Sequence, residues 1–135
     1  MTGGWRFVGW MCAGMLVVAL GSRVGLVVVG GRSMQPALYP GDVCLFVRGQ
    51  SPRVGDVVLI DQPVNRDVLH RVELVREGGV CRTRGDANAV SDRELRRIED
   101  LRGTVRFTLP LGKGAYGWMQ AVRGATLLNQ SHTRR

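Results

Sequence analysis

The chain has few side chains that can act as a general base. Its 19 basic residues are 18 arginines and one lysine, Lys113, and its two histidines are His70 and His132. Arginine stays protonated in proteins and therefore cannot take a proton from a nucleophile. His132 lies in the polar final residues, whereas residues 67–75 around His70 alternate as in a strand with one covered face. His70 is therefore the better candidate.

Cysteine is scarce, and the chain lacks the spacing of a metal or nucleotide site. Cys44 and Cys81 fall in apolar β-like segments, where free cysteine commonly behaves as a small buried hydrophobe. A disulfide between them is the less favoured alternative, because the sequence does not give the required Cβ distance. No Cys, His and Asp set has zinc spacing, and no glycine cluster opens a predicted helix. We expect no metal and no cofactor.

Long hydrophobic runs are also absent. Residues 7–21 are uncharged, and at ~1.5 Å per residue they would span ~22 Å of the ~30 Å hydrocarbon core of a bilayer. We interpret residues 1–22 as a short membrane anchor, flanked by tryptophan and arginine. A signal peptide cleaved near residues 19–21 and a buried soluble helix are the alternatives.

Short β-branched apolar runs, by contrast, are frequent. They occupy residues 24–29, 43–47, 57–60, 68–75, 80–83 and 105–109, with glycine turns at 41–42, 55–56 and 78–79. A single β-rich domain over residues 23–111 is predicted, because the chain is long enough for one core. Residues 93–101 are expected to form one or two helical turns or a solvated loop. Residues 112–135 are interpreted as an interfacial or core-capping tail.

Ser33 is the candidate nucleophile. The run 24–29 ends at Gly30 and Gly31 and places this serine at the start of a turn-rich loop. Such a serine is usually a turn hydroxyl, and it becomes a nucleophile only when a base such as His70 takes its proton. Asp86 and Asp92 lie in a later turn-rich run, where a carboxylate either orients a histidine or caps a turn.

The strand that precedes the serine also predicts how a substrate binds. An extended peptide can add its backbone to an exposed strand edge, and two glycines let that backbone approach closely. We therefore predict that Val29, Gly30, Gly31 and Arg32 bind substrate.

Five motifs in order resemble the conserved boxes of the type I signal peptidases. They are SMQPALYPGD, VGDVVLI, LHRVELV, RGDANAVSDR and LRGTVRF, and the resemblance covers about residues 24–109. The histidine in LHRV stands where the common bacterial enzymes carry lysine, as in the endoplasmic-reticulum and archaeal branch. The resemblance implies a mainly β, partly open barrel or sandwich with one short N-terminal membrane helix. It also implies a membrane-anchored serine endopeptidase that removes signal peptides from secreted preproteins.

Carried onto matching positions, the resemblance implies that Ser33 is the nucleophile, His70 the general base and Asp92 the acid that orients it. Asp86 would support the site or take the orienting role itself, with Arg71 and Met34 as further supporting residues.

The resemblance also implies that small substrate residues before the scissile bond fit shallow pockets lined by Met34 and the strand at residues 24–29. The alternative is that Met34 only fills the core.

Two of the departures from the family pattern concern the catalytic groups. Gly31 replaces a serine that some relatives use as an oxyanion donor, so the oxyanion hole must use backbone N–H groups such as that of Ser33. Ser91 replaces the first acid of a common Asp-Asp pair, which points to Asp92 as the functional one.

The expected partners are secreted preproteins, membrane lipid and an accessory subunit. A net charge of +8 favours anionic headgroups, and nucleic acid is not expected because the arginines are scattered. We expect a single-pass protein of the cell membrane with an extracytoplasmic catalytic domain, although the nearly symmetric flanking charges do not give the orientation. The alternatives are a non-catalytic module that binds extended peptides at the membrane, and a protease dedicated to one secreted partner.

Overall fold

The computed structural model describes residues 21, 23–62, 67–115 and 117. The predicted anchor, apart from Gly21, and most of the predicted tail lie outside the described residues. Within the described ranges, no helix has the length and apolar character needed to cross a membrane.

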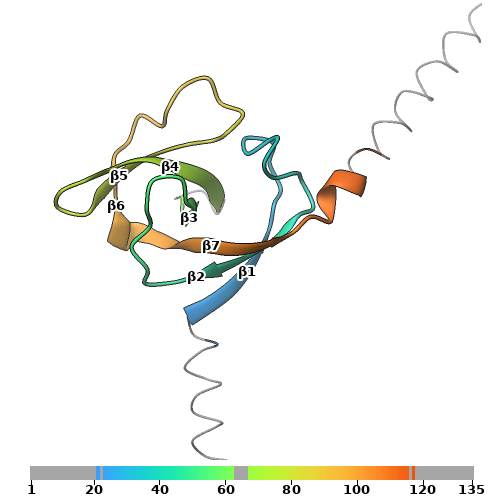
Figure 1. Ribbon diagram of the computed structural model, residues 1–135, viewed down its shortest axis with the longest axis horizontal. Coiled ribbons are helices and arrows are strands. Elements are labelled where there is room, and N and C mark those ends of the chain that lie inside the picture. The colour runs from blue at the N-terminus through green and yellow to red at the C-terminus, as the bar shows by residue number, and fades with distance from the viewer. Residues whose placement is uncertain (1–20, 22, 63–66, 116, 118–135) are drawn as a thin grey trace, which may run out of the picture.

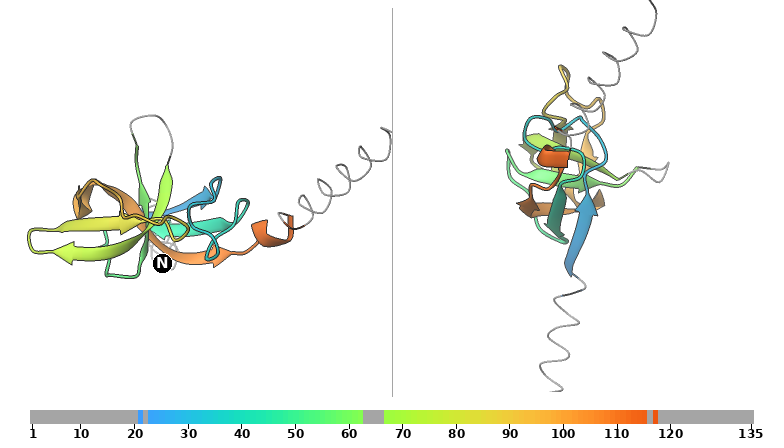
Figure 2. Two further views of the ribbon diagram at one scale, coloured as in Figure 1. Left: turned by 90° about the horizontal axis from the view of Figure 1, so that it is seen from above. Right: turned by 90° about the vertical axis from the view of Figure 1, so that its right-hand side faces the viewer.

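Seven strands form one antiparallel sheet in the described part of the chain. They are β1 (Val24–Val28), β2 (Val43–Val47), β3 (Val57–Ile60), β4 (Val68–Arg76), β5 (Val80–Arg84), β6 (Arg96–Arg97) and β7 (Leu101–Leu109), with a 3-10 turn, η1 (Ile98–Asp100), before β7. Their order in the sheet is β1-β2-β7-β3-β4-β5-β6. The sheet curls into a half-barrel (Figure 1), and Figure 2 shows the same curl from two further directions. The prediction of a mainly β fold is confirmed.

Irregular pairing accompanies the curl of the sheet. The register shifts between Leu45 and Phe46 on β2, between Leu59 and Ile60 on β3, and between Val72 and Leu74 on β4. An extra residue in one strand of an antiparallel pair bends that strand and increases its twist. As a result β1 and the start of β4 line one cleft, although β2, β7 and β3 lie between them in the sheet.

Residues 93–101 match the prediction of a helical turn or solvated loop only in part, at the exposed residues 93–95 and at the single turn η1. Arg96 and Arg97 pair with β5 as a short strand, and η1 leads directly into β7. Strand β7 also begins at Leu101 rather than at residue 105. Glycine and charged residues are poor strand formers, so the sequence of this segment does not predict its extended form. That form depends on pairing with distant strands. The glycine turns at 41–42, 55–56 and 78–79 are confirmed, each with a glycine at positive φ.

The apolar core has two parts. Val29, Met34 and Leu38 from the β1 end and its following loop pack with Cys44, Phe46, Leu59 and Leu69. Val58, Ile60, Val72 and Cys81 form the second cluster. Cys44 and Cys81 are free, buried and in different clusters, and burial raises the pKa of both thiols. Neither of these cysteines therefore acts as a thiolate nucleophile at neutral pH.

Asp42 joins the loop after β1 to the segment after β7. Its side chain is buried, and its two carboxylate oxygens accept hydrogen bonds from Tyr39 N at 2.8 Å and Gly112 N at 2.7 Å. A methyl group on Gly112 would lie 2.1 Å from the carbonyl oxygen of Pro40, so only glycine permits this close approach. The carboxylate thus holds the loop that follows the candidate nucleophile.

Replacing Asp42 with alanine is expected to lower the free energy of unfolding by about 2–4 kcal/mol, because two backbone donors lose their acceptor. Urea denaturation followed by circular dichroism measures this change. Asp61, which is exposed, provides the matched control, and Asp61→Ala should change stability by less than about 0.5 kcal/mol. Equal stability of Asp42→Ala and Asp61→Ala would show that the carboxylate does not hold these segments together.

Candidate active site

His70 and Asp92 meet directly. His70 lies on β4 and is buried, and its Nδ1 is 2.7 Å from Asp92 Oδ2. Because a carboxylate oxygen accepts, this contact places the imidazole proton on Nδ1 and leaves Nε2 as the nitrogen that can accept a proton. The arrangement is that of a histidine held in one tautomer by an acid.

Strand β5 holds Asp92 in place. The Thr83 hydroxyl donates to Asp92 Oδ2 at 2.6 Å, and the Asp92 backbone N–H donates to the Thr83 carbonyl oxygen at 2.9 Å. Thr83 is fully buried. The sequence reasoning assigned Thr83 no role, because its contacts with Asp92 depend on how the loop after β5 folds back over its own strand.

Ser33 lies in the loop after β1 and packs against the turn after β5. Its carbonyl oxygen accepts a hydrogen bond from Ala87 N at 2.8 Å. A methyl group on Gly85 would lie 2.6 Å from that same oxygen, so the glycine is required by a close approach of two backbones. The turn that leads toward Asp92 therefore also positions the backbone of Ser33. Gly85 is a second residue that sequence reasoning missed.

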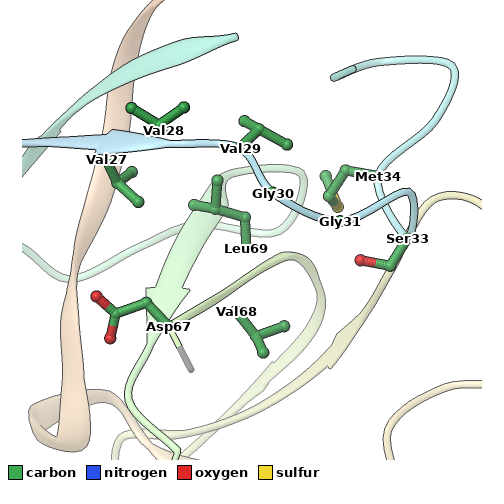
Figure 3. Close-up of a pocket in the computed structure, with 10 residues that line it drawn as sticks. All are labelled: Val27, Val28, Val29, Gly30, Gly31, Ser33, Met34, Asp67, Val68 and Leu69. Atoms are coloured by element: carbon green, nitrogen blue, oxygen red, sulfur yellow. The ribbon is translucent and has the colours of Figure 1, made fainter. Parts of the chain in front are cut away.

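A cleft of about 90 Å³ runs beside Ser33. One wall is formed by residues 27–31 at the end of β1, and the other by residues 67–69 at the start of β4, with Met34 also in the lining. Figure 3 shows Ser33 at one end of the cleft and Asp67 at the other, with mainly apolar side chains between them. A cleft of this volume with a mainly apolar lining has room for a small apolar side chain.

The predicted substrate-binding residues are not all in this cleft. Val29, Gly30 and Gly31 line it, whereas Arg32 is exposed and is not among the lining residues. Met34 has both of the roles considered for it, since it lines the cleft and is 1% exposed in the core.

No protein-family model matches the chain. Curated relatives are nevertheless similar over most of its length. The signal peptidase complex catalytic subunit of Scheffersomyces stipitis is 34% identical over 117 residues, which cover 77% of this chain and 69% of the relative. The corresponding subunit of Debaryomyces hansenii is 33% identical over 119 residues, 78% of this chain and 70% of the relative. That of Candida tropicalis is 35% identical over 108 residues, 70% of this chain and 65% of the relative.

The chain belongs to the type I signal peptidase family. This confirms the resemblance seen in the five motifs, and the protein is a serine endopeptidase. The contact between His70 and Asp92 therefore lies in a member of a serine peptidase family. The thiols of Cys44 and Cys81, which are buried, do not compete for the role of nucleophile in this signal peptidase.

Asp86 is bound by Arg71 in this signal peptidase. The guanidinium donates from Nε to Oδ1 at 2.9 Å and from Nη2 to Oδ2 at 2.6 Å, while Nη1 donates to the Gly55 carbonyl oxygen at 2.7 Å. The hydrogen bonds to Asp86 raise the pKa of the Arg71 guanidinium. Both oxygens of Asp86 are therefore committed to arginine, and the carboxylate at His70 is that of Asp92.

Metal ligands do not gather at the site. Across the ranges that the structure describes, no group of three His, Cys, Asp or Glu side chains is placed to hold a metal ion. The polar groups near His70 are instead paired with one another or with the backbone.

Proposed function

We propose that this signal peptidase removes signal peptides from secreted preproteins by an acyl-enzyme mechanism that uses Ser33, His70 and Asp92. The observation that carries this proposal is the 2.7 Å contact between His70 Nδ1 and Asp92 Oδ2. The position of Ser33 in the lining of the adjacent cleft supports it, because a nucleophile must reach the bound peptide.

The first half of the reaction forms the acyl-enzyme. Ser33 Oγ attacks the carbonyl carbon of the scissile bond as His70 Nε2 takes the hydroxyl proton. Asp92 stabilises the imidazolium that results, and backbone N–H groups, including that of Ser33, hold the oxyanion. The tetrahedral intermediate then breaks its C–N bond, and His70 gives its proton to the departing amine.

Water completes the turnover. His70 takes a proton from the water molecule as its oxygen attacks the acyl carbon, and the ester bond to Ser33 breaks while the proton passes to Ser33 Oγ. The carboxyl product leaves, and the histidine is neutral again.

The preprotein binds in an extended form beside β1. This strand is at the edge of the sheet and, among the described residues, pairs only with β2, so its other edge can hydrogen-bond a peptide backbone. Small side chains before the scissile bond fit the shallow apolar cleft between residues 27–31 and 67–69. Val29, Gly30, Gly31 and Met34 make this part of the site.

Membrane lipid contacts the outer face of β1, β2 and β7. Cross-strand pairing places Leu26 beside Leu45 and Leu45 beside Phe107, and Leu26 and Phe107 are 70% and 58% exposed. A second row joins Val28, Val43 and Leu109. An apolar face of this size on a sheet is unusual at a surface that faces only water. Together with the net charge of +8, it supports a position on an anionic bilayer.

A label on this face is expected to enter the bilayer. The full chain carrying Phe107→Cys and Cys12→Ser is labelled with a fluorophore, and quenching by spin-labelled lipid in anionic vesicles is measured. Cys44 and Cys81 are buried and stay unlabelled in the folded protein. The control label replaces Val75, an exposed apolar residue on β4. We expect several-fold stronger quenching at residue 107 than at residue 75, and equal quenching would contradict the proposed lipid contact.

The protein acts at the cell membrane, with the catalytic domain on the extracytoplasmic side and an accessory subunit as partner. The relatives support the accessory subunit, since their names describe catalytic subunits of a complex. The single-pass anchor proposed for residues 1–22 fits the same location.

The proposed reaction is tested on a preprotein with an Ala-x-Ala site. The full chain in detergent is expected to cut after the second alanine, as determined by mass spectrometry of both products. A matched preprotein with tryptophan in place of the second alanine should remain intact, because a large side chain does not fit the shallow cleft. Failure to cut any preprotein, even with added membrane extract as a source of accessory subunits, would contradict the proposal.

A further inference from the structure

Glu73 occupies a β-bulge on the strand that carries His70. Val72 pairs with Thr83 and Leu74 pairs with Arg82, so Glu73 is an extra residue without a partner on β5. A bulge redirects the side chain of its extra residue and often lies beside a functional site. This bulge is three residues after His70 on β4 and directly follows the partner of Thr83, the residue that binds Asp92.

The Glu73 carboxylate binds two partners. Its Oε2 accepts a short hydrogen bond, 2.5 Å, from the hydroxyl of Ser91, and its Oε1 lies 2.6 Å from Nε of Arg84. Arg84 thus binds one carboxylate oxygen of Glu73, and the Ser91 hydroxyl binds the other. The carboxylate side chain is 27% exposed, so both contacts are partly shielded from water.

Ser91 directly precedes Asp92, in a loop whose other residues are mostly exposed. Residues 87–90 and 93–95 are all exposed, whereas Ser91 and Asp92 are half-buried. The loop therefore approaches the sheet at these two residues. Asp92 binds Thr83 and His70, and Ser91 binds Glu73 one position earlier.

We propose that Glu73 and Ser91 are positioning residues that keep the carboxylate of Asp92 on Nδ1 of His70. This inference rests on the proposed function, because it assigns Asp92 the orienting role. The hydrogen bond to Glu73 fixes the backbone on the N-terminal side of Asp92. Without it, the loop is held near the histidine mainly by the contacts of Asp92 itself, and the carboxylate loses its defined position.

The contact between Glu73 and Ser91 also gives a physical reason for a serine at position 91. An aspartate there would bring a second negative charge against Glu73, and two carboxylates in contact repel each other. A serine hydroxyl instead donates a hydrogen bond to the same oxygen. The residue types at positions 73 and 91 are therefore coupled in this chain.

The test is steady-state cleavage of the Ala-x-Ala preprotein by the full chain with single and double substitutions. Ser91→Ala should lower kcat about tenfold with little change in KM, because a hydrogen bond to a charged group is lost away from the cleft. Ser91→Thr keeps a hydroxyl and should retain wild-type kcat. Ser91→Asp should lower kcat more than Ser91→Ala, and Glu73→Gln in that background should restore part of the loss.

The control is Glu99→Gln, which removes an exposed ion pair with Arg97 and should leave kcat unchanged. Thermal unfolding of every variant shows whether it is folded. A wild-type kcat in Ser91→Ala would overturn the inference. So would a loss confined to KM, or a Ser91→Asp variant that Glu73→Gln does not improve.

A second readout does not depend on turnover. With His132→Gln in the background, nuclear magnetic resonance of nitrogen-15-labelled histidine observes the Nδ1 proton of His70 alone. We expect a downfield Nδ1 proton in the wild type that exchanges rapidly with water in Ser91→Ala and is restored in Ser91→Thr. An identical signal in all three would overturn the positioning role. An inactive wild type would count against the proposed function and leave this measurement valid.

Discussion

Replacing Ser33 or His70 with alanine is expected to reduce kcat for preprotein cleavage by a factor on the order of 10⁶, as for other nucleophile and base pairs of serine peptidases. In the proposed mechanism the two residues act in one step, so losing either leaves no activated nucleophile. The double variant should therefore be no less active than either single variant. Binding in the cleft and the oxyanion donors account for the small remaining rate.

Single-turnover cleavage with excess enzyme measures this loss without interference from product release. Ser51→Ala removes an exposed serine outside the Ser33 cleft and should keep wild-type activity. His132→Ala tests the other histidine in the same way. Circular dichroism confirms that each variant is folded. Cleavage that survives in folded His70→Ala would refute the assignment of the base and would favour a module that binds peptides without catalysing their hydrolysis.

Replacing Asp92 with asparagine is expected to lower kcat by a factor of about 10⁴. An asparagine amide can donate to the imidazole, which would place the histidine proton on the wrong nitrogen. The stabilisation of the imidazolium by a negative charge is also lost. Since aspartate and asparagine have nearly the same size, the effect should appear in kcat rather than in the folding of the protein.

Asp86→Asn is the matched comparison. Asp86 binds Arg71 through both oxygens, so this substitution weakens an ion pair instead of the contact with His70. Arg71 is 35% exposed, and we expect a loss of stability on the order of 1 kcal/mol with a tenfold or smaller effect on kcat. A loss of kcat in Asp86→Asn as large as that in Asp92→Asn would mean that Asp86, and not Asp92, has the orienting role.

Gly85 and Thr83 explain why the loop after β5 can serve two functions. The turn at Gly85 packs against the backbone of Ser33, and Thr83 binds the carboxylate that contacts His70. The end of β5 therefore positions both the backbone of Ser33 and the carboxylate that contacts His70. A single strand that supports both reduces the relative motion of the proposed nucleophile and base, and catalysis depends strongly on that geometry.

Local sequence signals were enough to predict five of the strands and the candidate base. Short β-branched runs between glycine turns predict β1 to β5 within one residue, because extended backbone and left-handed glycine turns are local preferences. His70 follows from composition and strand-like alternation, since the chain offers few groups that can accept a proton. The order of the five motifs was enough to identify the family.

Long-range contacts in the fold, by contrast, set which carboxylate contacts His70, where β7 begins and what Glu73 contacts. Asp86 and Asp92 lie in one turn-rich run, and their different partners depend on how that run packs against β4 and β5. Leu101 joins β7 because Ile60 lies beside it, and Glu73 reaches Ser91 because a bulge shifts the pairing of β4. These features rest on contacts between residues distant in the chain, which local preferences do not encode.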